Sequence, residues 1–303
     1  MSDAIDLMVS ERDAGQRLDA FVSRAAGMSR ARAARLIADG ALLVDDSPAS
    51  KSLRLEPGMR VHVPGDEPAA EGLEPEDLPV RVVYQDDALL VLSKPAGLVV
   101  HPAPGHPAGT LANALVRLGG AGGDPGRPGI VHRLDAGTSG LMIVARSEEA
   151  FAVLATAMAA REISRTYLAL VEGQPDTDTL TIDAPIGRSP RHRKKMAVVA
   201  GGKEALTRVT VLERHPRTAL VEAKPHTGRT HQIRVHLAAA GHPVVGDAVY
   251  GRDRKLAGAL GLERPFLHAA RLSFSHPMTG AVIELEDPLP ADLDAVLARA
   301  RAD

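Results

Sequence analysis

Two apolar runs flank a short charged turn within residues 128–146, and this pattern limits the fold more than any other feature of the sequence. Gly137 and Gly140 lie in the turn, where their freedom to adopt a positive φ permits a tight reversal. The second run, residues 141–145, has no polar side chain, which is typical of a strand buried on both faces. The pattern predicts a strand, a tight loop and a buried strand, with Asp135 on a rim that a ligand can reach.

Asp135 has an ordinary explanation as well as a functional one. An aspartate before glycine commonly accepts hydrogen bonds from its own turn, and the spacing alone does not choose between the two. Ser139 does not form a nucleophile elbow, because Leu141 stands where that motif requires a second glycine. No Lys-Ser or Lys-Thr pair follows the glycines, so the turn is not a phosphate-binding loop either.

The same turn carries a family resemblance. Residues 132–135 read His-Arg-Leu-Asp and residues 137–140 read Gly-Thr-Ser-Gly, which resembles the catalytic motif of the RluA/RluD-type RNA pseudouridine synthases. The resemblance implies that Asp135 is the catalytic nucleophile. It also implies that Arg133 fills the space left by a flipped base and that His132 contacts RNA.

Composition limits the classes to which the chain can belong. At 303 residues there is room for one large and one small domain. The absence of cysteine excludes disulfides, thiolate catalysis and cysteine-ligated zinc, and it is compatible with the reducing cytoplasm, where we expect the protein to act. We expect no signal peptide, because residues 1–10 carry two aspartates and lack an apolar core, and no membrane partner, because no apolar run is long enough to span a bilayer. The net charge of −2 does not itself indicate nucleic-acid binding, so the distribution of basic residues matters more.

Residues 11–65 have the pattern of a small, separate α/β unit. Ser29 suits the N-cap of a helix over residues 30–39, which Gly40 would end. The whole segment resembles an S4 RNA-binding domain, in which the second helix presents basic side chains to RNA phosphates. A run of arginines on a helix is often only a solvated face. The candidate RNA contacts on this helix are Arg30, Arg32 and Arg35.

Residues 66–79 are acidic and rich in proline and glycine, which predicts a linker. We expect a catalytic domain over residues 80–303. Its fold class is α+β, with a core of mixed, mainly antiparallel sheet and flanking helices. The Ser-Lys-Pro-Ala-Gly-Leu segment at 93–98 resembles a family segment that enters this core, although a proline-glycine turn alone would look similar. Strands are expected at 80–84, 88–92, 164–173, 203–211 and 218–223, and helices at 110–118, 147–160 and 292–302.

Tyr167 lies in the predicted strand 164–173. A tyrosine in a strand usually serves packing. Here it occupies the position of the family's second motif, so the resemblance implies that it stacks on the target base. Only three tyrosines are present in the chain, so a functional role is considered for each of them.

Residues 227–237 form the second specific segment, a glycine loop that runs into a helix. His231 and His236 invite a metal site, but they are five residues apart with no glutamate between them, unlike a zincin helix, so we expect no metal. The segment resembles the family's third motif. In that motif Arg234 is the arginine that pairs with the catalytic aspartate.

The densest basic run covers residues 188–195 and follows a predicted turn. Such a run is usually a solvated surface, but on a protein that handles RNA it is a reasonable phosphate contact. The candidate RNA contacts from this run and from the third motif are Arg191, Arg193, Lys194, Lys195 and Arg229.

Pseudouridine formation breaks the N1–C1′ bond of uridine, rotates the base and rejoins it through C5. There is no redox change and no net hydrolysis, so we expect no cofactor. A carboxylate suits the nucleophilic step, whether it attacks C1′ of the ribose or C6 of the base. A guanidinium beside Asp135 would favour its ionised form and orient its oxygens, which is the role expected of Arg234.

The sequence therefore predicts a monomeric enzyme that isomerises specific uridines in structured RNA. An S4-like segment before an RluA-type core most resembles the RluD-like enzymes, which implies 23S-type ribosomal RNA or a pre-ribosomal particle as the substrate, and tRNA is the alternative. A non-catalytic RNA-binding or ribosome-assembly factor would bind RNA without converting it. A nucleoside or glycoside hydrolase usually needs a second carboxylate, and none is evident in the matched motifs.

Overall fold

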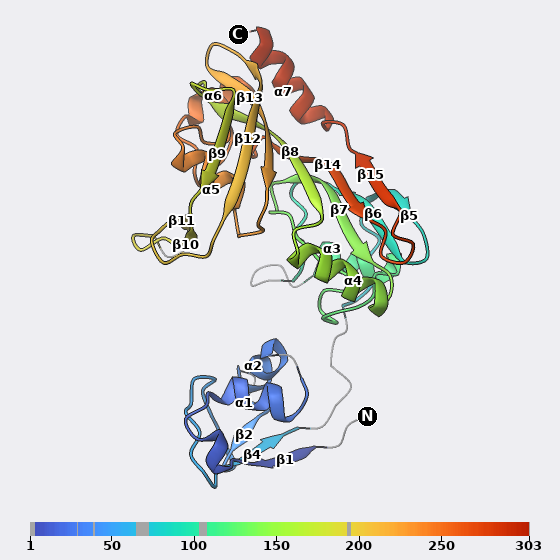
Figure 1. Ribbon diagram of the computed structural model, residues 1–303, viewed down its shortest axis with the longest axis vertical. Helices are drawn as coiled ribbons and strands as arrows, with labels where there is room; N and C mark the ends of the chain where they lie inside the picture. Colours follow the sequence, from blue (N-terminus) through green and yellow to red (C-terminus); the bar gives the residue numbers. More distant parts are fainter. Residues whose placement is uncertain are drawn as a thin grey trace. The chain divides into compact units, whose positions relative to one another are not determined.

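The structure is a computed structural model that describes residues 4–28, 30–38, 40–64, 73–102, 108–192 and 195–302 (Figure 1). The chain divides into two compact units, Met1–Gly72 and Leu73–Asp303, and each is described by itself. The domain boundaries expected from the sequence stay predictions.

The first unit is a small antiparallel sheet packed against two helices. Its core contains Leu18, Phe21, Ile37 and Val61, all at most 5% exposed. The first strand was not expected from the sequence, and it forms the edge of the sheet by pairing with the last strand. The strands, in the order β1-β4-β2-β3, are β1 (Ile5–Met8), β4 (Arg60–Val63), β2 (Leu43–Val44) and β3 (Ser47–Pro48). The two helices are α1 (Leu18–Ala25) and α2 (Arg30–Ala38), and a short 3₁₀ turn, η1 (Glu11–Asp13), precedes them.

Helix α2 is present where the sequence predicts it, and Gly40 follows it with a left-handed φ of 70°. Ser29, the expected N-cap, lies outside the described residues. The side chains expected to contact RNA from this helix, those of Arg30, Arg32 and Arg35, also lie outside the described part of the chain.

The second unit is built on one nine-stranded sheet, ordered β5-β6-β7-β14-β8-β13-β12-β9 with β15 also pairing with β14 (Figure 1). Neighbouring strands are antiparallel except β7 and β14, which are parallel, so the expected mixed, mainly antiparallel sheet is confirmed. The strands of this sheet are β5 (Arg81–Gln85), β6 (Leu89–Lys94), β7 (Ser139–Ala145), β8 (Ser164–Glu172), β9 (Thr179–Asp183), β12 (Leu206–Arg214), β13 (Thr218–Pro225), β14 (Leu267–Ser275) and β15 (Val282–Glu286). A separate hairpin is formed by β10 (Ile186–Arg188) and β11 (Met196–Val198).

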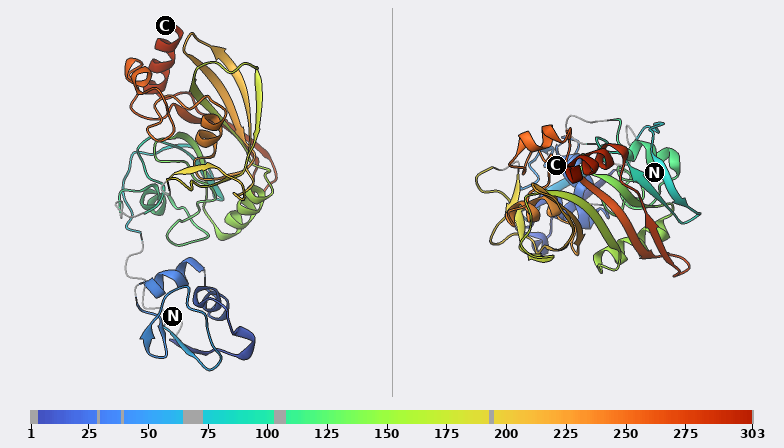
Figure 2. Two further views of the ribbon diagram at one scale, coloured as in Figure 1. Left: turned by 90° about the vertical axis from the view of Figure 1, so that its left-hand side faces the viewer. Right: turned by 90° about the horizontal axis from the view of Figure 1, so that it is seen from above.

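Helices cover both faces of the sheet, which explains the uninterrupted apolar runs of β6 and β7. Leu90 and Leu92 pack with the α3 side chains, whereas Leu89 and Val91 pack with those of α4. Alternate residues of a strand point to opposite faces, so a strand covered on both sides has no polar face to show. Figure 2 shows α3, α6 and α7 on one side of the sheet and α4 on the other. The helices are α3 (Leu111–Leu118), α4 (Glu148–Ala159), α5 (Gln232–Ala239), α6 (Arg254–Ala259) and α7 (Ala291–Ala302).

The first of the two apolar runs within residues 128–146, which precedes the charged turn, does not form the expected strand. Ile130 makes only an isolated bridge with Val144. Pro128 has no N–H to donate, and the N–H of Gly129 bonds to the carbonyl of Gly122, so no ladder can extend from this side. The second run is β7, buried along its whole length as the sequence predicts.

Part of the expected linker is attached to the second unit. Asn113 of α3 donates its side-chain amide to the carbonyl of Glu74 at 3.0 Å. The Glu76 carboxylate accepts from the N–H of Gly109 at 2.9 Å. Residues 73–79 therefore lie along the start of α3 rather than forming an unattached connection.

Candidate active site

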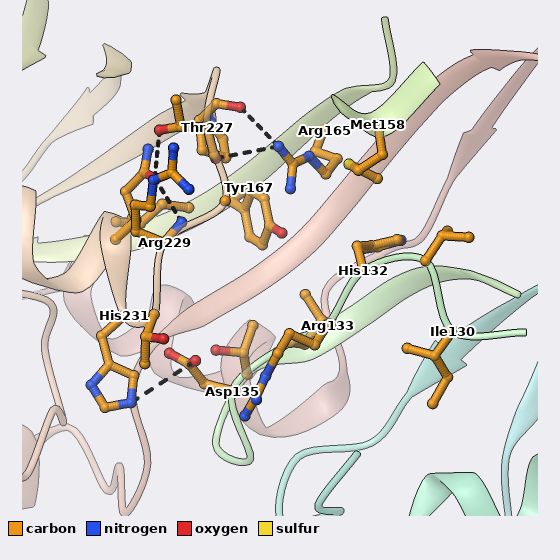
Figure 3. A pocket seen from close by; sticks show the side chains of 18 of the residues that line it. Ile130, His132, Arg133, Asp135, Met158, Arg165, Tyr167, Thr227, Arg229 and His231 are labelled. Carbon is orange, nitrogen blue, oxygen red and sulfur yellow. Dashed lines mark hydrogen bonds and ion pairs between the residues drawn. The ribbon is translucent and has the colours of Figure 1, made fainter. Parts of the chain in front are cut away.

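A cavity of about 550 Å³ opens beside the middle strands of the large sheet (Figure 3). It is lined by the loop before β7, by the start of β8 and by the loop that enters α5. Among its described lining residues, Asp135 is the single carboxylate. The arginines that line it are Arg127, Arg133, Arg161, Arg165, Arg229 and Arg234. Such a surface suits a polyanion.

Asp135 reaches the cavity from the tight loop before β7, and its side chain is 21% exposed. Its Oδ2 accepts a hydrogen bond from Nη1 of Arg234 at 3.0 Å. Its Oδ1 lies 4.0 Å from Nε2 of His231. The loop is closed by the backbone bond from Thr138 N–H to the Asp135 carbonyl, so the carboxylate is not spent on its own turn.

The loop that carries Asp135 is held from behind by the segment at 93–98. Lys94 is fully buried, and its Nζ donates to the carbonyls of Pro95, Leu98 and Ala136. Burial lowers the pKa of Lys94 to about 7, although the charge of Asp135 opposes this. Because Ala136 follows the nucleophile candidate directly, this buried lysine fixes the loop from its core side.

Gly140, at the start of β7, is required by close packing as well as by its backbone conformation. Its φ is 114°, and a Cβ at this position would overlap the Ala269 carbonyl of β14. Only glycine allows the parallel pair of β7 and β14 to approach this closely.

Arg234 is fixed between two carboxylates. Asp247 binds its Nε and Nη2 at 2.7 and 2.8 Å, which leaves Nη1 for Asp135. Burial would lower the pKa of Arg234, but the two carboxylates raise it overall. Asp247 is itself buried, which would raise its pKa, yet the guanidinium and the N–H groups of Val249 and Tyr250 hold that pKa below its usual value.

Tyr167 lies on β8 between Arg165 and Asp135 (Figure 3). It is 6% exposed and lines the cavity. Burial raises the pKa of its hydroxyl, so the group stays protonated at neutral pH. Its neighbours in the sheet are Ala223 and Ala269, whose small side chains leave room beside the ring.

Three of the expected RNA contacts line the cavity: His132, Arg133 and Arg229. Arg133 is exposed, with Nη1 at 3.4 Å from the His101 ring, whereas Arg229 donates to the carbonyl of Glu204 at 2.9 Å. His132 is buried, and its Nε2 accepts the Ile143 N–H at 3.0 Å. Burial lowers the pKa of His132 to about 3, so the ring is neutral.

The described residues of the basic run lie at the end of β10 and on the loop after it, and none of them lines the cavity. Arg191 and Lys195 are exposed there, and Nζ of Lys195 donates to the Val249 carbonyl at 2.9 Å. Arg193 and Lys194 lie outside the described residues.

The two histidines of the third motif do not face one another. His236 is fully buried, with Nδ1 on the Thr207 hydroxyl and Nε2 on the Ala184 carbonyl, so it is a satisfied core histidine. His231 instead lines the cavity beside Asp135.

Sequence reasoning missed three residues of the site. Arg165 precedes Tyr167 by two positions, and the alternation of a strand could have placed both on one face. Asp247 and Tyr250 belong to a segment that continues the family match, but no local signal showed that they support Arg234.

Comparisons with known proteins show the family of this chain. The family model for RNA pseudouridylate synthases matches residues 88–239, which include Asp135, Tyr167 and Arg234. The chain belongs to the RNA pseudouridine synthase family. The S4 domain model matches residues 16–61, so the synthase carries an S4 domain before its catalytic core.

Relatives extend the likeness over nearly the whole chain. An uncharacterized RNA pseudouridine synthase of Mycobacterium bovis is 43% identical over 94% of this chain and 94% of its own. Ribosomal large subunit pseudouridine synthase D of Zymomonas mobilis is 42% identical with the same two coverages, 94% and 94%. Among solved structures, human RNA pseudouridylate synthase domain containing 1 matches with a TM-score of 0.59 and 31% identity, covering 74% of this chain and 90% of that one.

The fold class and the enzyme class expected from the sequence are thereby confirmed. RNA is the substrate of the synthase, in agreement with the arginines around its cavity. In the described part of the chain, no helix is long and apolar enough to cross a membrane.

Proposed function

We propose that the synthase converts specific uridines of large-subunit ribosomal RNA into pseudouridine, with Asp135 as the nucleophile. The observation that supports the proposal is that only one of the two oxygens of this carboxylate accepts a hydrogen bond from the described part of the chain. Arg234 holds one oxygen at 3.0 Å, while the other oxygen faces a cavity lined by arginines. Large-subunit RNA is favoured because relatives at 42% identity are named ribosomal large subunit pseudouridine synthase D.

Asp135 would form the bond that releases N1 of the base from the ribose. Whether its oxygen attacks C1′ or C6, the step requires an ionised oxygen that no other group occupies. Arg234 holds the carboxylate in place by its 3.0 Å contact, and Asp247 keeps the guanidinium aligned from the other side. The freed base then turns and rejoins the ribose through C5, and the bond to Asp135 breaks, which returns the free carboxylate. C5 loses a proton and N1 gains one, so the reaction needs no cofactor.

Tyr167 would stack on the uracil while it turns. Base–aromatic stacking contributes about 1–3 kcal/mol, enough to retain the base between the two bonds. Extruding the target from its helix costs a few kcal/mol, and Arg133, an exposed residue of the cavity lining, would fill the gap. The proposed RNA contacts at the cavity are Arg133, His132 and Arg229, and those elsewhere are Arg30, Arg32, Arg35, Arg191, Arg193, Lys194 and Lys195.

The finer organisation is part of the same proposal. We place an S4 domain at residues 11–65, a linker at 66–79 and the catalytic domain at 80–303. The enzyme would act as a monomer in the cytoplasm, without a membrane partner. Its substrate would be ribosomal RNA or a pre-ribosomal particle in preference to tRNA, which the relatives' names support.

The test is tritium release from 5-tritiated, unmodified RNA by wild type and by Asp135→Asn. We expect wild type to release tritium from large-subunit RNA, and the variant to bind the same RNA without releasing any. A tRNA pool in a parallel arm tests the substrate class. Release by Asp135→Asn would exclude it as the nucleophile. Binding without release by wild type would favour an assembly factor, and liberation of free uracil would indicate a hydrolase.

A further inference from the structure

His231 lies between the nucleophile candidate and a tyrosine that faces it from a different segment. Its Nε2 is 4.0 Å from Oδ1 of Asp135, and its Nδ1 is 2.9 Å from the hydroxyl of Tyr250. Figure 3 shows the His231 ring turned toward Asp135. The side chain is 27% exposed, so it belongs to the wall of the cavity rather than to the core.

The contacts of Tyr250 determine which ring nitrogen of His231 carries the proton. The Tyr250 hydroxyl accepts the N–H of Met196 at 3.1 Å, which leaves its own proton free to donate to Nδ1. The negative charge of Asp135 favours a proton on Nε2, the nitrogen that faces it. Both contacts select the same tautomer, with Nδ1 as acceptor and Nε2–H directed at the carboxylate.

The backbone at His231 is unusual for a residue with a side chain. Its φ is 57°, in the left-handed region, immediately before α5. A non-glycine residue adopts this conformation only where its surroundings hold it there. The edge-on contact with the Tyr250 ring, with centroids 5.7 Å apart, is one such restraint. The conformation brings the ring to Asp135 while Arg234, three residues later, reaches the same carboxylate from the helix.

We propose that His231 is a positioning residue for Asp135, and that the Tyr250 hydroxyl sets the tautomer through which it acts. The inference rests on the proposed role of Asp135 as nucleophile. A separation of 4.0 Å is too long for a hydrogen bond, so His231 orients Oδ1 without occupying its lone pairs. Arg234 fixes Oδ2, and the Nε2–H dipole of His231 attracts Oδ1, so that the carboxylate cannot rotate freely.

A role in proton transfer fits the contacts less well. Burial lowers the pKa of His231, although the Asp135 charge opposes this, so the ring is neutral near pH 7. With Nε2 protonated, its cavity-facing nitrogen cannot accept a proton. Tyr250 also serves Arg234, whose guanidinium lies 5.2 Å above the ring centre, so the hydroxyl and the ring of this tyrosine have separable effects.

The test compares two amides at position 231. His231→Gln places an amide N–H near the position of Nε2 and keeps the contact with Asp135. His231→Asn matches Nδ1 instead, so it keeps the Tyr250 contact and tolerates the left-handed backbone, but it does not reach Asp135. We measure single-turnover tritium release with enzyme in excess, together with the RNA dissociation constant.

We expect His231→Gln to react within about 10-fold of wild type and His231→Asn to react about 100-fold more slowly, because small misplacements of a reacting group are costly. Neither variant should change RNA affinity. Equal rates for the two variants, or a faster His231→Asn, would overturn the proposal and indicate a structural role through Tyr250.

Tyr250→Phe supplies an independent test, since it removes the hydroxyl and keeps the ring under Arg234. We expect it to slow wild type by about 10-fold and to have no effect in the His231→Gln background, because an amide has no tautomer to set. The same loss in both backgrounds would contradict the proposal. An unchanged rate for Tyr250→Phe in the wild-type background would contradict it even if a substitution at 231 failed to fold. Failure of the proposed function looks different: wild type would release no tritium, or Asp135→Asn would remain active.

Discussion

Two aspartates on tight turns of the second unit have similar exposure but differ in the number of hydrogen bonds that their carboxylates accept. The side chain of Asp86, between β5 and β6, is 29% exposed, and that of Asp135 is 21% exposed. Asp86 accepts from the Tyr84 hydroxyl, from two backbone N–H groups and from the His276 ring, all within 2.9 Å. Asp135 accepts one bond, from Arg234.

The difference shows what separates a structural carboxylate from the proposed nucleophile. Burial does not distinguish the two, because their exposures are nearly equal. The donors do: both oxygens of Asp86 are occupied, whereas Oδ1 of Asp135 has only His231 nearby, at 4.0 Å. An oxygen that is already accepting two bonds is a poor nucleophile, and an oxygen held in place but left open is a good one. The comparison therefore predicts opposite outcomes for the same substitution at the two sites.

The largest effect is expected at Asp135. Asp135→Asn should lower kcat by about 10⁴-fold or more, because the amide removes the nucleophile itself. The free energy of unfolding should change by less than about 1 kcal/mol, since the carboxylate does not hold its turn. Single-turnover kinetics and urea unfolding of the same preparation check both parts. A marked loss of stability would contradict the comparison, because it would show that Asp135, like Asp86, stabilises its own turn.

Asp247→Asn should affect both activity and stability. Asp247 is 4% exposed and binds Arg234 through both oxygens, so the amide leaves a buried guanidinium without its main partner. We expect a loss of about 3 kcal/mol in the free energy of unfolding. The rate should fall by about 100-fold, because Arg234 would no longer hold Asp135 in place. Arg217 contacts Asp253, whose side chain is 41% exposed and also accepts the Leu256 N–H at the start of α6. Asparagine caps a helix about as well as aspartate, so Asp253→Asn is a control that should change neither quantity appreciably.

Local sequence signals predicted much of the frame around these sites. The helix expected at 147–160 is α4, whose N-cap Ser147 accepts from the Ala150 N–H. The buried strand after the glycine turn is β7. These elements follow from periodicity, capping and turn chemistry, which act between near neighbours in the chain.

Contacts between distant segments could not be found in the same way. Arg234 and Asp135 are 99 residues apart, and only the family resemblance indicated that they meet. Nothing in the residues around Asp247 showed that it would brace Arg234, and nothing around Tyr250 showed that it would reach His231. The bland explanation of an aspartate in a turn fits Asp86 and not Asp135, a distinction made by donors that fold back from other strands and loops.

The pH dependence of the free energy of unfolding tests whether the charge of Asp86 stabilises its turn. Burial would raise the pKa of this carboxyl, but its hydrogen bonds lower it from 3.8 to about 2. A pKa depressed in the folded state stabilises the fold above pH 3.8, and this contribution is lost as the pH falls through about 2. The shift corresponds to about 2 kcal/mol.

Asp86→Asn should therefore lower the free energy of unfolding by about 2 kcal/mol at pH 7, and the gap from wild type should close as the pH falls from 4 toward about 2. Urea unfolding across this range measures the gap. The rate of tritium release at pH 7 should stay within about 2-fold of wild type, because Asp86 does not line the cavity. A constant gap at all pH values would mean that the charge of Asp86 is not what stabilises the turn.

The smallest effect is expected from removing one donor to Asp86. Tyr84→Phe deletes the hydroxyl that donates to Oδ2 at 2.6 Å, while the ring keeps its place against Leu89 and its neighbours. One hydrogen bond to a charged acceptor contributes about 1.5 kcal/mol, so the variant should lose about that much stability and no activity. The loss should be absent in the Asp86→Asn background if the hydroxyl acts only through the charge, because the cycle isolates the pair. An equal loss in both backgrounds would attribute the effect to packing of the ring instead.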